Sequence, residues 1–115
     1  MITRIWHGWT TLPNAQAYEK LLRTEIFQGI VTRHIEGFRG IDLLRRSHPD
    51  EVEFVTIMWF DSLAAVQAFA GPDYELAVVP SAARALLRRF DARSAHYDTI
   101  ERRSPSEGAR TARAD

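Results

Sequence analysis

The chain has no cysteine among its 115 residues. Disulfides, thiolate nucleophiles and zinc–thiolate centres are therefore excluded. The sequence has no apolar run near the roughly 20 residues that a membrane span needs, and its first residues lack the apolar stretch of a secretory signal. Neither sign of charge is in excess, because 15 basic and 15 acidic side chains cancel. We therefore expect neither a nucleic-acid partner nor a membrane partner.

The residues that are present indicate a single cytoplasmic domain. A hydrophobic content of 45% suffices for one packed core at this length, and 26% charged residues is an ordinary globular share that argues against general disorder. Beyond Glu101 the chain carries no large apolar side chain. We therefore expect one domain over residues 1–101 and a disordered tail over 102–115.

Hydrophobic periodicity and turn residues divide the domain into strands and helices. Runs of β-branched and aromatic residues predict strands, and apolar residues at three- and four-residue spacing predict amphipathic helices. The expected elements are a strand over 3–9, a helix over 15–32, strands over 38–46 and 53–60, helices over 63–70 and 81–90, and a strand over 91–100. Gly40, inside the second strand, indicates a bulge.

Particular residues support the two later helices. Ser62 is a favourable N-cap for the helix over 63–70, and Gly71 ends that helix. The helix over 81–90 rests on one apolar stripe at positions i, i+3, i+4 and i+7: Ala83, Leu86, Leu87 and Phe90. The complete order, β-α-β-β-α-β, is typical of the ferredoxin-like fold, an α+β class in which an antiparallel four-stranded sheet carries helices on one face.

The third predicted strand is apolar on both of its faces. Side chains alternate along a strand, and here both sets are apolar: Phe54, Met58 and Phe60 on one face, Val55, Ile57 and Trp59 on the other. The helices of such a fold cover only one face of the sheet. We therefore expect a second subunit to cover the other face, in a homodimer packed sheet against sheet.

Two short motifs lie at the ends of these strands. Gly37-Phe38-Arg39-Gly40 opens the second strand, and Trp59-Phe60-Asp61-Ser62 leads into the helix that carries Phe69. With these motifs and this order of elements, residues 2–100 resemble the antibiotic biosynthesis monooxygenase family. The resemblance implies a dimeric α+β barrel with a ligand pocket between helices and sheet. It also implies oxidation of aromatic polyketides by O₂ without metal or flavin, while other members cleave haem or act on quinols.

The family's catalytic residues are replaced in this chain. Polyketide-oxidising members have an Asn, a Trp and a Tyr where this chain has Thr56, Phe60 and Val66. Haem-degrading members have an Asn, a Trp and a His at positions that match Trp6 or His7, Phe69 and about Val79. The candidate site must therefore be argued from the residues of this chain.

The segment Trp6-His7-Gly8-Trp9 carries the first catalytic candidate. His7 and Trp9 share one face of the strand, and Trp6 takes the other. A neutral imidazole in an apolar cavity could accept a proton from a phenolic or enolic substrate, the step that precedes reaction with O₂ when no cofactor takes part. His7 is thus the expected catalytic base. The alternative is a hydrogen-bonded core histidine between packing tryptophans.

His96 and Tyr74 are the other catalytic candidates. Strand pairing brings His96 toward the first strand, where it could relay a proton or, alternatively, lie exposed at a sheet edge. Tyr74 follows the break at Gly71, so its phenol could orient a ligand or simply cap the core. Two histidines without a third ligand do not make a metal centre, and none is predicted.

These residues indicate a small dimeric enzyme with a hydrophobic pocket. The expected substrate-binding residues are Trp6, Thr56, Met58, Phe60 and Phe69. The predicted function is a cofactor-independent, monooxygenase-like oxidation of a hydrophobic aromatic substrate, polyketide- or quinol-like, by O₂. Two alternatives stay open: a dimeric protein that binds a small aromatic ligand without turnover, and, third in order, a haem-degrading monooxygenase.

Overall fold

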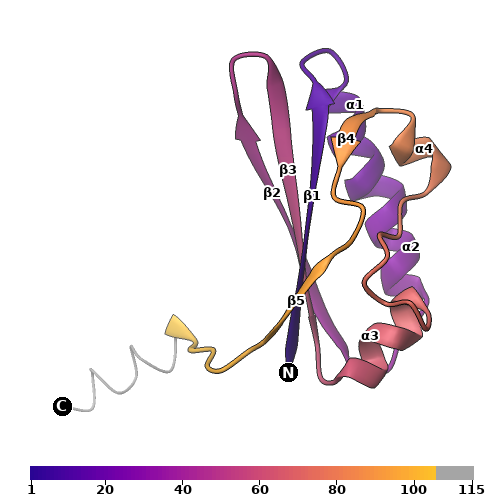
Figure 1. Ribbon diagram of the computed structural model, residues 1–115, viewed down its shortest axis with the longest axis vertical. Helices are drawn as coiled ribbons and strands as arrows, with labels where there is room; N and C mark the ends of the chain where they lie inside the picture. Colours follow the sequence, from indigo (N-terminus) through magenta and orange to yellow (C-terminus); the bar gives the residue numbers. More distant parts are fainter. Residues whose placement is uncertain (106–115) are drawn as a thin grey trace.

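The computed structural model describes residues 1–105 and contains one antiparallel sheet with helices on one of its faces (Figure 1). In chain order the elements are β1 (Ile2–Thr11), α1 (Ala15–Leu21), η1 (Leu22–Ile26), α2 (Phe27–Thr32), β2 (Phe38–Ser47), β3 (Glu51–Phe60), α3 (Leu63–Ala70), α4 (Ser81–Arg84), β4 (Leu87–Phe90) and β5 (Ala95–Asp98). The expected ferredoxin-like α+β fold is confirmed.

The first strand of the chain is the central strand of the sheet. The order is β2-β3-β1-β4, and β5 also pairs with β1. Along one edge, β1 pairs with β3 over its whole length; along the other, β4 lies opposite residues 8–10 and β5 opposite residues 2–5. Two short strands therefore share the edge for which the sequence predicted one strand over 91–100. In β2 the register shifts between Phe38 and Gly40, which confirms the bulge.

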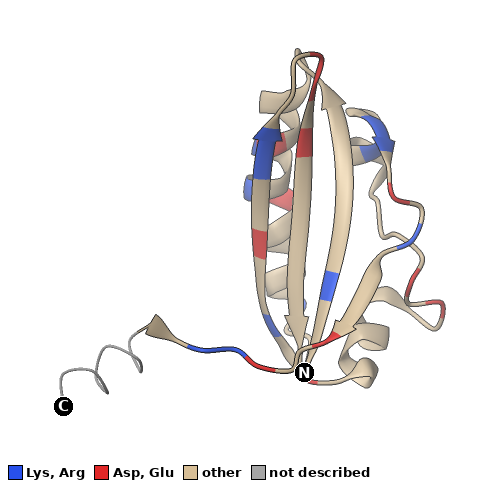
Figure 2. Ribbon diagram, turned by 60° about the vertical axis from the view of Figure 1, so that its left-hand side comes forward, with Lys and Arg blue, Asp and Glu red and all other residues tan. Residues whose placement is uncertain are grey.

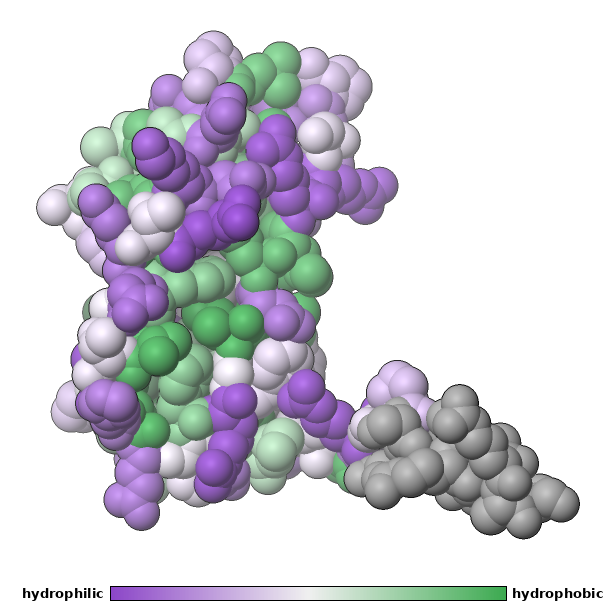
Figure 3. Space-filling view, turned by 180° about the vertical axis from the view of Figure 1, so that it is seen from behind, coloured by the Kyte–Doolittle hydropathy of each residue, from purple (hydrophilic) through white to green (hydrophobic). Residues whose placement is uncertain are grey.

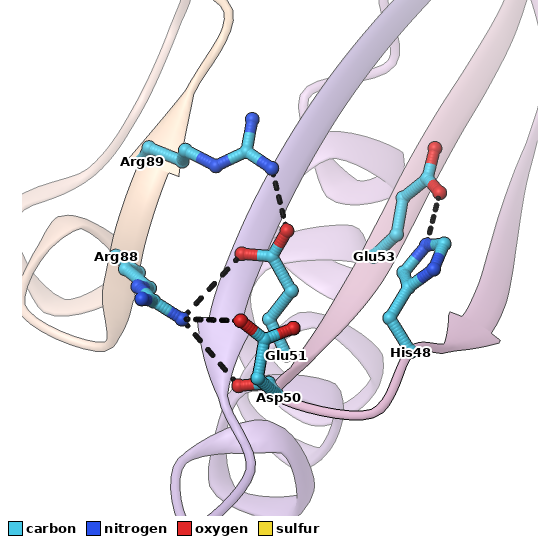
Figure 4. A network of polar contacts seen from close by, with 6 residues as sticks. All are labelled: His48, Asp50, Glu51, Glu53, Arg88 and Arg89. Atoms are coloured by element: carbon cyan, nitrogen blue, oxygen red, sulfur yellow. Dashed lines mark hydrogen bonds and ion pairs between the residues drawn. The ribbon is translucent and has the colours of Figure 1, made fainter.

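The predicted helix over 81–90 is wrong beyond its first turn. Helix α4 ends at Arg84, and Leu87–Phe90 forms β4 instead. The free edge of β1 offers backbone donors and acceptors to this segment. Pairing with this distant strand stabilises the segment more than the helix that its apolar spacing predicted. Ion pairs also hold β4 in place (Figure 4): Arg89 Nη2 lies 2.5 Å and Arg88 Nη1 3.7 Å from carboxylate oxygens of Glu51, at the start of β3.

The long first helix forms as expected but with one irregular turn. Helices α1 and α2 are continuous through η1, a π-helical segment of 5 residues. Such a segment widens the helix by a residue and often lies at a functional site. Leu22, its first residue, is buried against the sheet, so the irregular turn belongs to the packed side of the helix.

Two groups of buried side chains form the core between sheet and helices. One is centred on Tyr18 and Phe54, whose ring centroids lie 4.9 Å apart, and the other on Phe60, Val66 and Phe69. Helix α3 reaches the second group because Ser62 caps it, as predicted, with its Oγ accepting a hydrogen bond from the Ala65 backbone N–H at 3.2 Å.

Within residues 1–105, no helix covers the face of the sheet that points away from α1–α3 (Figure 2), and the side chains at the centre of this face are apolar. We call this face, with Ile5, Trp9, Val55, Ile57 and Trp59 at its centre, the outer face. All five side chains are partly exposed, whereas the alternate positions Val52, Phe54, Met58 and Phe60 are buried. Seen from behind, hydrophobic side chains also gather below a belt of polar ones (Figure 3). The expectation of two apolar sheet faces is therefore met.

The end of the described chain runs beside the outer face. Arg102 places its guanidinium 4.2 Å from the ring centroid of Trp59. The disordered tail expected over 102–115 falls mostly on residues 106–115, which lie outside the described residues. Within residues 1–105, the helices are all too short or too polar to cross a bilayer.

Candidate functional site

A cavity of about 60 Å³ lies between the sheet and the helices. Its sheet wall consists of Arg4, Trp6, Ile41, Thr56 and Met58. Its helix wall consists of Tyr18, Leu22, Ile26, Phe27 and Ile30, which include the ends of the π-helical turn. The remaining wall comes from later segments: Phe69, Val78, Val79, Pro80, Ala83 and Ser94. The lining is mostly apolar and aromatic, as in small-molecule sites.

Most of the predicted substrate-binding residues are at this cavity. Trp6, Thr56, Met58 and Phe69 line it. Phe60 lies one layer behind, fully buried, with its ring centroid 5.8 Å from that of Phe69. The structure thus brings these side chains together, and their role in binding stays a prediction.

His7, the expected catalytic base, does not line the cavity. Trp6 takes the inward position on β1, so His7 points to the outer face, where its ring stacks on Trp9 at a centroid distance of 5.8 Å. Asp91 holds both residues: its backbone carbonyl accepts from the Trp6 indole N–H at 2.8 Å, and its carboxylate accepts from the backbone N–H and Nδ1 of His7 at 3.0 and 2.8 Å. His7 is therefore a partnered residue beside the outer face.

Arg4 brings the other two catalytic candidates together. It lies directly opposite His96 in the β1–β5 ladder and is 3% exposed. Its Nη1 donates to the Tyr74 carbonyl at 2.5 Å and to Nε2 of His96 at 3.0 Å, and its Nη2 donates to the Leu76 carbonyl at 3.5 Å. Because a guanidinium only donates, Nε2 of His96 accepts and the ring proton lies on Nδ1.

His96 and Tyr74 lie behind Arg4 rather than in the cavity wall. The Tyr74 ring meets the His96 ring edge-on at a centroid distance of 5.2 Å, and it is the Tyr74 carbonyl, not the phenol, that contacts Arg4. The structure therefore places both residues where they position the arginine.

Burial sets the protonation of the groups at the cavity. Burial lowers the pKa of Arg4 to about 10, which leaves the guanidinium charged at neutral pH. Burial, and then the Arg4 charge, lowers the pKa of His96, while Glu75 and the Ser94 backbone act more weakly in the opposite direction. Burial raises the pKa of Tyr18, so its phenol stays protonated. The cavity thus combines one cation with neutral donors.

Sequence reasoning missed Arg4, Tyr18 and Ser94 as site residues. The signal for Arg4 was present, because it stands between Ile2 and Trp6 in the period-two pattern of β1 and so shares their inward face. Ser94 stands two positions before His96 and is 5% exposed, with an Oγ that has no partner among residues 1–105. No comparable signal marked Tyr18, whose spacing predicted only a helix face packed in the core.

The described residues offer no cluster of three His, Asp or Glu side chains that could hold a metal ion. No protein-family model matches the chain, and no curated protein matches it.

The fold is nevertheless shared with solved structures. A putative antibiotic biosynthesis monooxygenase from Bacillus cereus aligns with a TM-score of 0.64 at 16% identity, over 90% of this chain and 95% of that one. SnoaB, a cofactor-independent oxygenase from Streptomyces nogalater, gives 0.53 at 20% identity, over 90% and 95%. The haem-degrader MhuD from Mycobacterium tuberculosis, with two haems bound in its active site, gives 0.55 at 16% identity, over 90% and 100%. The resemblance to this fold family is confirmed, and such low identities carry no residue role across.

Proposed function

We propose that this chain, whose fold is that of the antibiotic biosynthesis monooxygenases, is a cofactor-independent monooxygenase-like enzyme acting on a small hydrophobic aromatic substrate. The observation that carries the proposal is the cavity between sheet and helices, whose wall is mostly apolar and contains a few polar side chains. Trp6, Met58 and Phe69 supply surfaces for an aromatic ring, and Arg4 and Ser94 are among the polar residues of the lining. The similarity to an oxygenase described as cofactor-independent supports the same assignment.

The proposed reaction converts an activated methylene between two aromatic rings to a ketone, and it requires the cavity of about 60 Å³ to widen, because the engineered cavity that holds benzene measures roughly 150 Å³. The substrate loses one C–H proton to a water molecule, since the described cavity lining offers no unprotonated basic side chain. The resulting carbanion reduces O₂ and takes a proton back to give a hydroperoxide on the same carbon, and loss of water leaves the carbonyl, so that CH₂ and O₂ give C=O and H₂O. The protein's part is to hold the ring, to exclude bulk water and to stabilise the delocalised oxyanion. His96 and Tyr74 act here as positioning residues for Arg4, and His7 has no contact with the cavity.

Oxygen consumption tests this proposal. An anthrone and a hydroquinone are offered to the purified protein, and we expect uptake of one O₂ for each ketone formed from the anthrone. Ala83→Leu should reduce the rate on the order of 100-fold, because the added carbons occupy a cavity of about 60 Å³. The matched control is Ala85→Leu in the exposed turn after α4, which should keep the wild-type rate.

The outcomes separate the two leading functions. Absence of oxygen uptake with either substrate would contradict the enzymatic proposal. Tight binding of the same compounds without uptake would favour the non-catalytic binding protein, which also fits the absence of a histidine from the cavity lining. Wild-type activity in a folded Ala83→Leu variant would place the reaction elsewhere on the chain.

We further propose that the protein is a cytoplasmic homodimer that packs through the outer face. The support is the row of partly exposed apolar side chains on β1 and β3, including Ile5, Val55 and Trp59, which the helices of the same chain leave uncovered (Figure 2). Sheet-on-sheet packing of two copies would remove this apolar surface from water.

A further inference from the structure

We propose that the cavity binds its ligand as an anion, with Arg4 as the receptor for an ionised oxygen on an aromatic ring. This inference rests on the proposed function only in using the same cavity. It names the substrate class more narrowly: an aromatic carboxylate, or a phenol or enol in its deprotonated form.

Arg4 is a buried cation without a carboxylate. It is 3% exposed, and within residues 1–105 its side chain makes no ion pair. Its partners are neutral: the carbonyls of Tyr74 and Leu76, and the imidazole of His96. Several exposed arginines do have acidic partners, as Arg93 has in Asp73 and Glu75. An unpaired buried charge is costly, and an anion in the adjoining cavity is the partner that would offset this cost.

The guanidinium retains donors for such an anion. These hydrogen bonds use two N–H groups of Nη1 and one of Nη2, and a guanidinium has five. The Nε–H and the second Nη2–H have no acceptor among the described residues. Arg4 lines the cavity, and its guanidinium lies 5.4 Å from the ring centroid of Phe69. This cation–π contact holds the guanidinium against the apolar wall.

A second donor in the cavity wall is tied to the same segment as Arg4: the Ser94 backbone N–H donates to the Glu75 carbonyl at 2.6 Å, and the carbonyls on either side of Glu75 accept from Arg4. Ser94 lines the cavity and is 95% buried, and its Oγ makes no hydrogen bond within the described chain. Buried hydroxyls are nearly always bonded, so an unbonded one in a cavity wall points to a missing acceptor. One oxyanion could accept from both Arg4 and Ser94, so a single ligand would pair the charge of Arg4 and the unbonded hydroxyl of Ser94.

His96 makes the arrangement selective for an anion rather than a neutral acceptor. Its neutral ring accepts from Arg4 and leaves the positive charge of the guanidinium uncompensated. A carboxylate at the same place would have neutralised that charge within the protein. The rest of the cavity is apolar, and its volume of about 60 Å³ is below the roughly 150 Å³ of an engineered cavity that holds benzene. A benzene-sized ring therefore requires the wall to move, at η1 or at residues 78–80.

Calorimetric titration with benzoate and benzamide tests the inference, because the two share size and shape and differ in charge. We expect benzoate to bind at least about tenfold more tightly than benzamide, as a charge-assisted hydrogen bond allows. Arg4→Gln should weaken benzoate binding about 10- to 100-fold and leave benzamide binding nearly unchanged. Arg39→Gln, which removes an exposed arginine paired with Asp61, is the matched control and should change neither.

A variant that unfolds would not decide the question, so Ser94→Ala provides a second route. It removes one hydroxyl beside Arg4 and should weaken benzoate binding about three- to tenfold while benzamide binding is retained. Equal affinity for the two probes, or an unchanged benzoate affinity in folded Arg4→Gln, would overturn the anion site and leave the proposed oxidation standing. Selective benzoate binding without oxygen uptake would support the anion site and contradict the oxidation.

Discussion

At the scale of single residues, the site depends on the alternation of side chains along β1. Arg4 and Trp6 face the cavity, and His7, one position further, faces away from it. A shift of one residue in the register would exchange these roles. The cavity therefore receives a permanent cation and an indole in place of the titratable imidazole that the sequence suggested. Chemistry at this site would depend on stabilising charge more than on accepting a proton.

The contact between Arg4 and His96 predicts a pH dependence of stability. The pKa of His96 is lowered in the folded chain from its ordinary value of 6.5, by burial and then by the Arg4 charge. Below pH 6.5 the unfolded chain takes up a proton that the folded chain resists, so this contribution to stability is present above pH 6.5 and is lost as the pH falls. We expect the melting temperature to decrease between pH 6.5 and pH 5.

The variant His96→Gln isolates this contribution. Its amide oxygen can still accept from Arg4, but it does not titrate, so the decrease on acidification should become smaller. Thermal denaturation of both proteins from pH 5 to pH 8 measures the difference. An identical pH profile would show that His96 is not the group that resists protonation.

At the scale of elements, local sequence patterns correctly predicted those features that depend on residues close together in the sequence. The hairpin of β2 and β3, the bulge at Gly40 and the cap at Ser62 follow from turn, bulge and cap residues next to them in sequence. The segment over 81–90 did not follow, because its helical stripe competes with the edge of β1. The local sequence around residues 81–90 contains no sign that β1, far away in the sequence, has an unpaired edge.

The same reasoning explains what was predictable of the site. Trp6, Thr56, Met58 and Phe69 could be placed at the cavity because large or inward-facing residues of strands and helices meet there in this fold. The choice of inward face on β1 was left open by apolar residues on both sides. Arg4 was overlooked, although it shares the inward face of Ile2 and Trp6, because a charged side chain in a strand is usually exposed, whereas Arg4 is buried.

Two glycines give a prediction for the connections between elements. Gly37, before β2, has φ +86°, and a Cβ there would lie 2.7 Å from the Cβ of Ala65. Gly37→Ala should therefore lower the free energy of unfolding by about 1–3 kcal/mol. Gly29→Ala is the matched control: Gly29 lies in α2 with no atom within 4 Å of the added Cβ, and the change should raise stability by about 0.5–1 kcal/mol. Urea denaturation of both variants measures the two changes in the free energy of unfolding, which should have opposite signs. Equal changes in the two variants would contradict the prediction.

At the scale of the whole molecule, the outer face is the feature on which the proposed oligomeric state depends. Its apolar side chains belong to β1 and β3, the two strands that also form the sheet wall of the cavity. Packing of a second copy on this face would stiffen both strands without entering the cavity. The proposed dimer interface and the proposed site therefore lie on opposite faces of the same sheet.

A charge placed on the outer face tests the dimer. Trp59→Glu should convert the homodimer to a monomer, because burying a carboxylate in an apolar interface is costly. Arg102 over the Trp59 ring offers the new carboxylate a partner in the monomer, so the variant should remain folded. Light scattering measures the molar mass, and Leu12→Glu, at a side chain that is 51% exposed in the turn after β1, is the control that should stay dimeric. A monomeric wild-type protein would contradict the interface.

The central position of β1 determines the order in which the fold can be completed. Its neighbours in the sheet are β3, about fifty residues later in sequence, and β4 and β5, which are the last elements of the domain. The two ends of the domain meet beside it, where the Thr99 backbone N–H donates to the Met1 carbonyl at 2.9 Å (Figure 1). During synthesis, this edge of β1 stays unpaired until β4 and β5 emerge from the ribosome. The β2–β3 hairpin is local, but every pairing of β1 joins distant parts of the sequence, so we expect folding to be slow for a chain of this length and to finish when β4 and β5 add to β1.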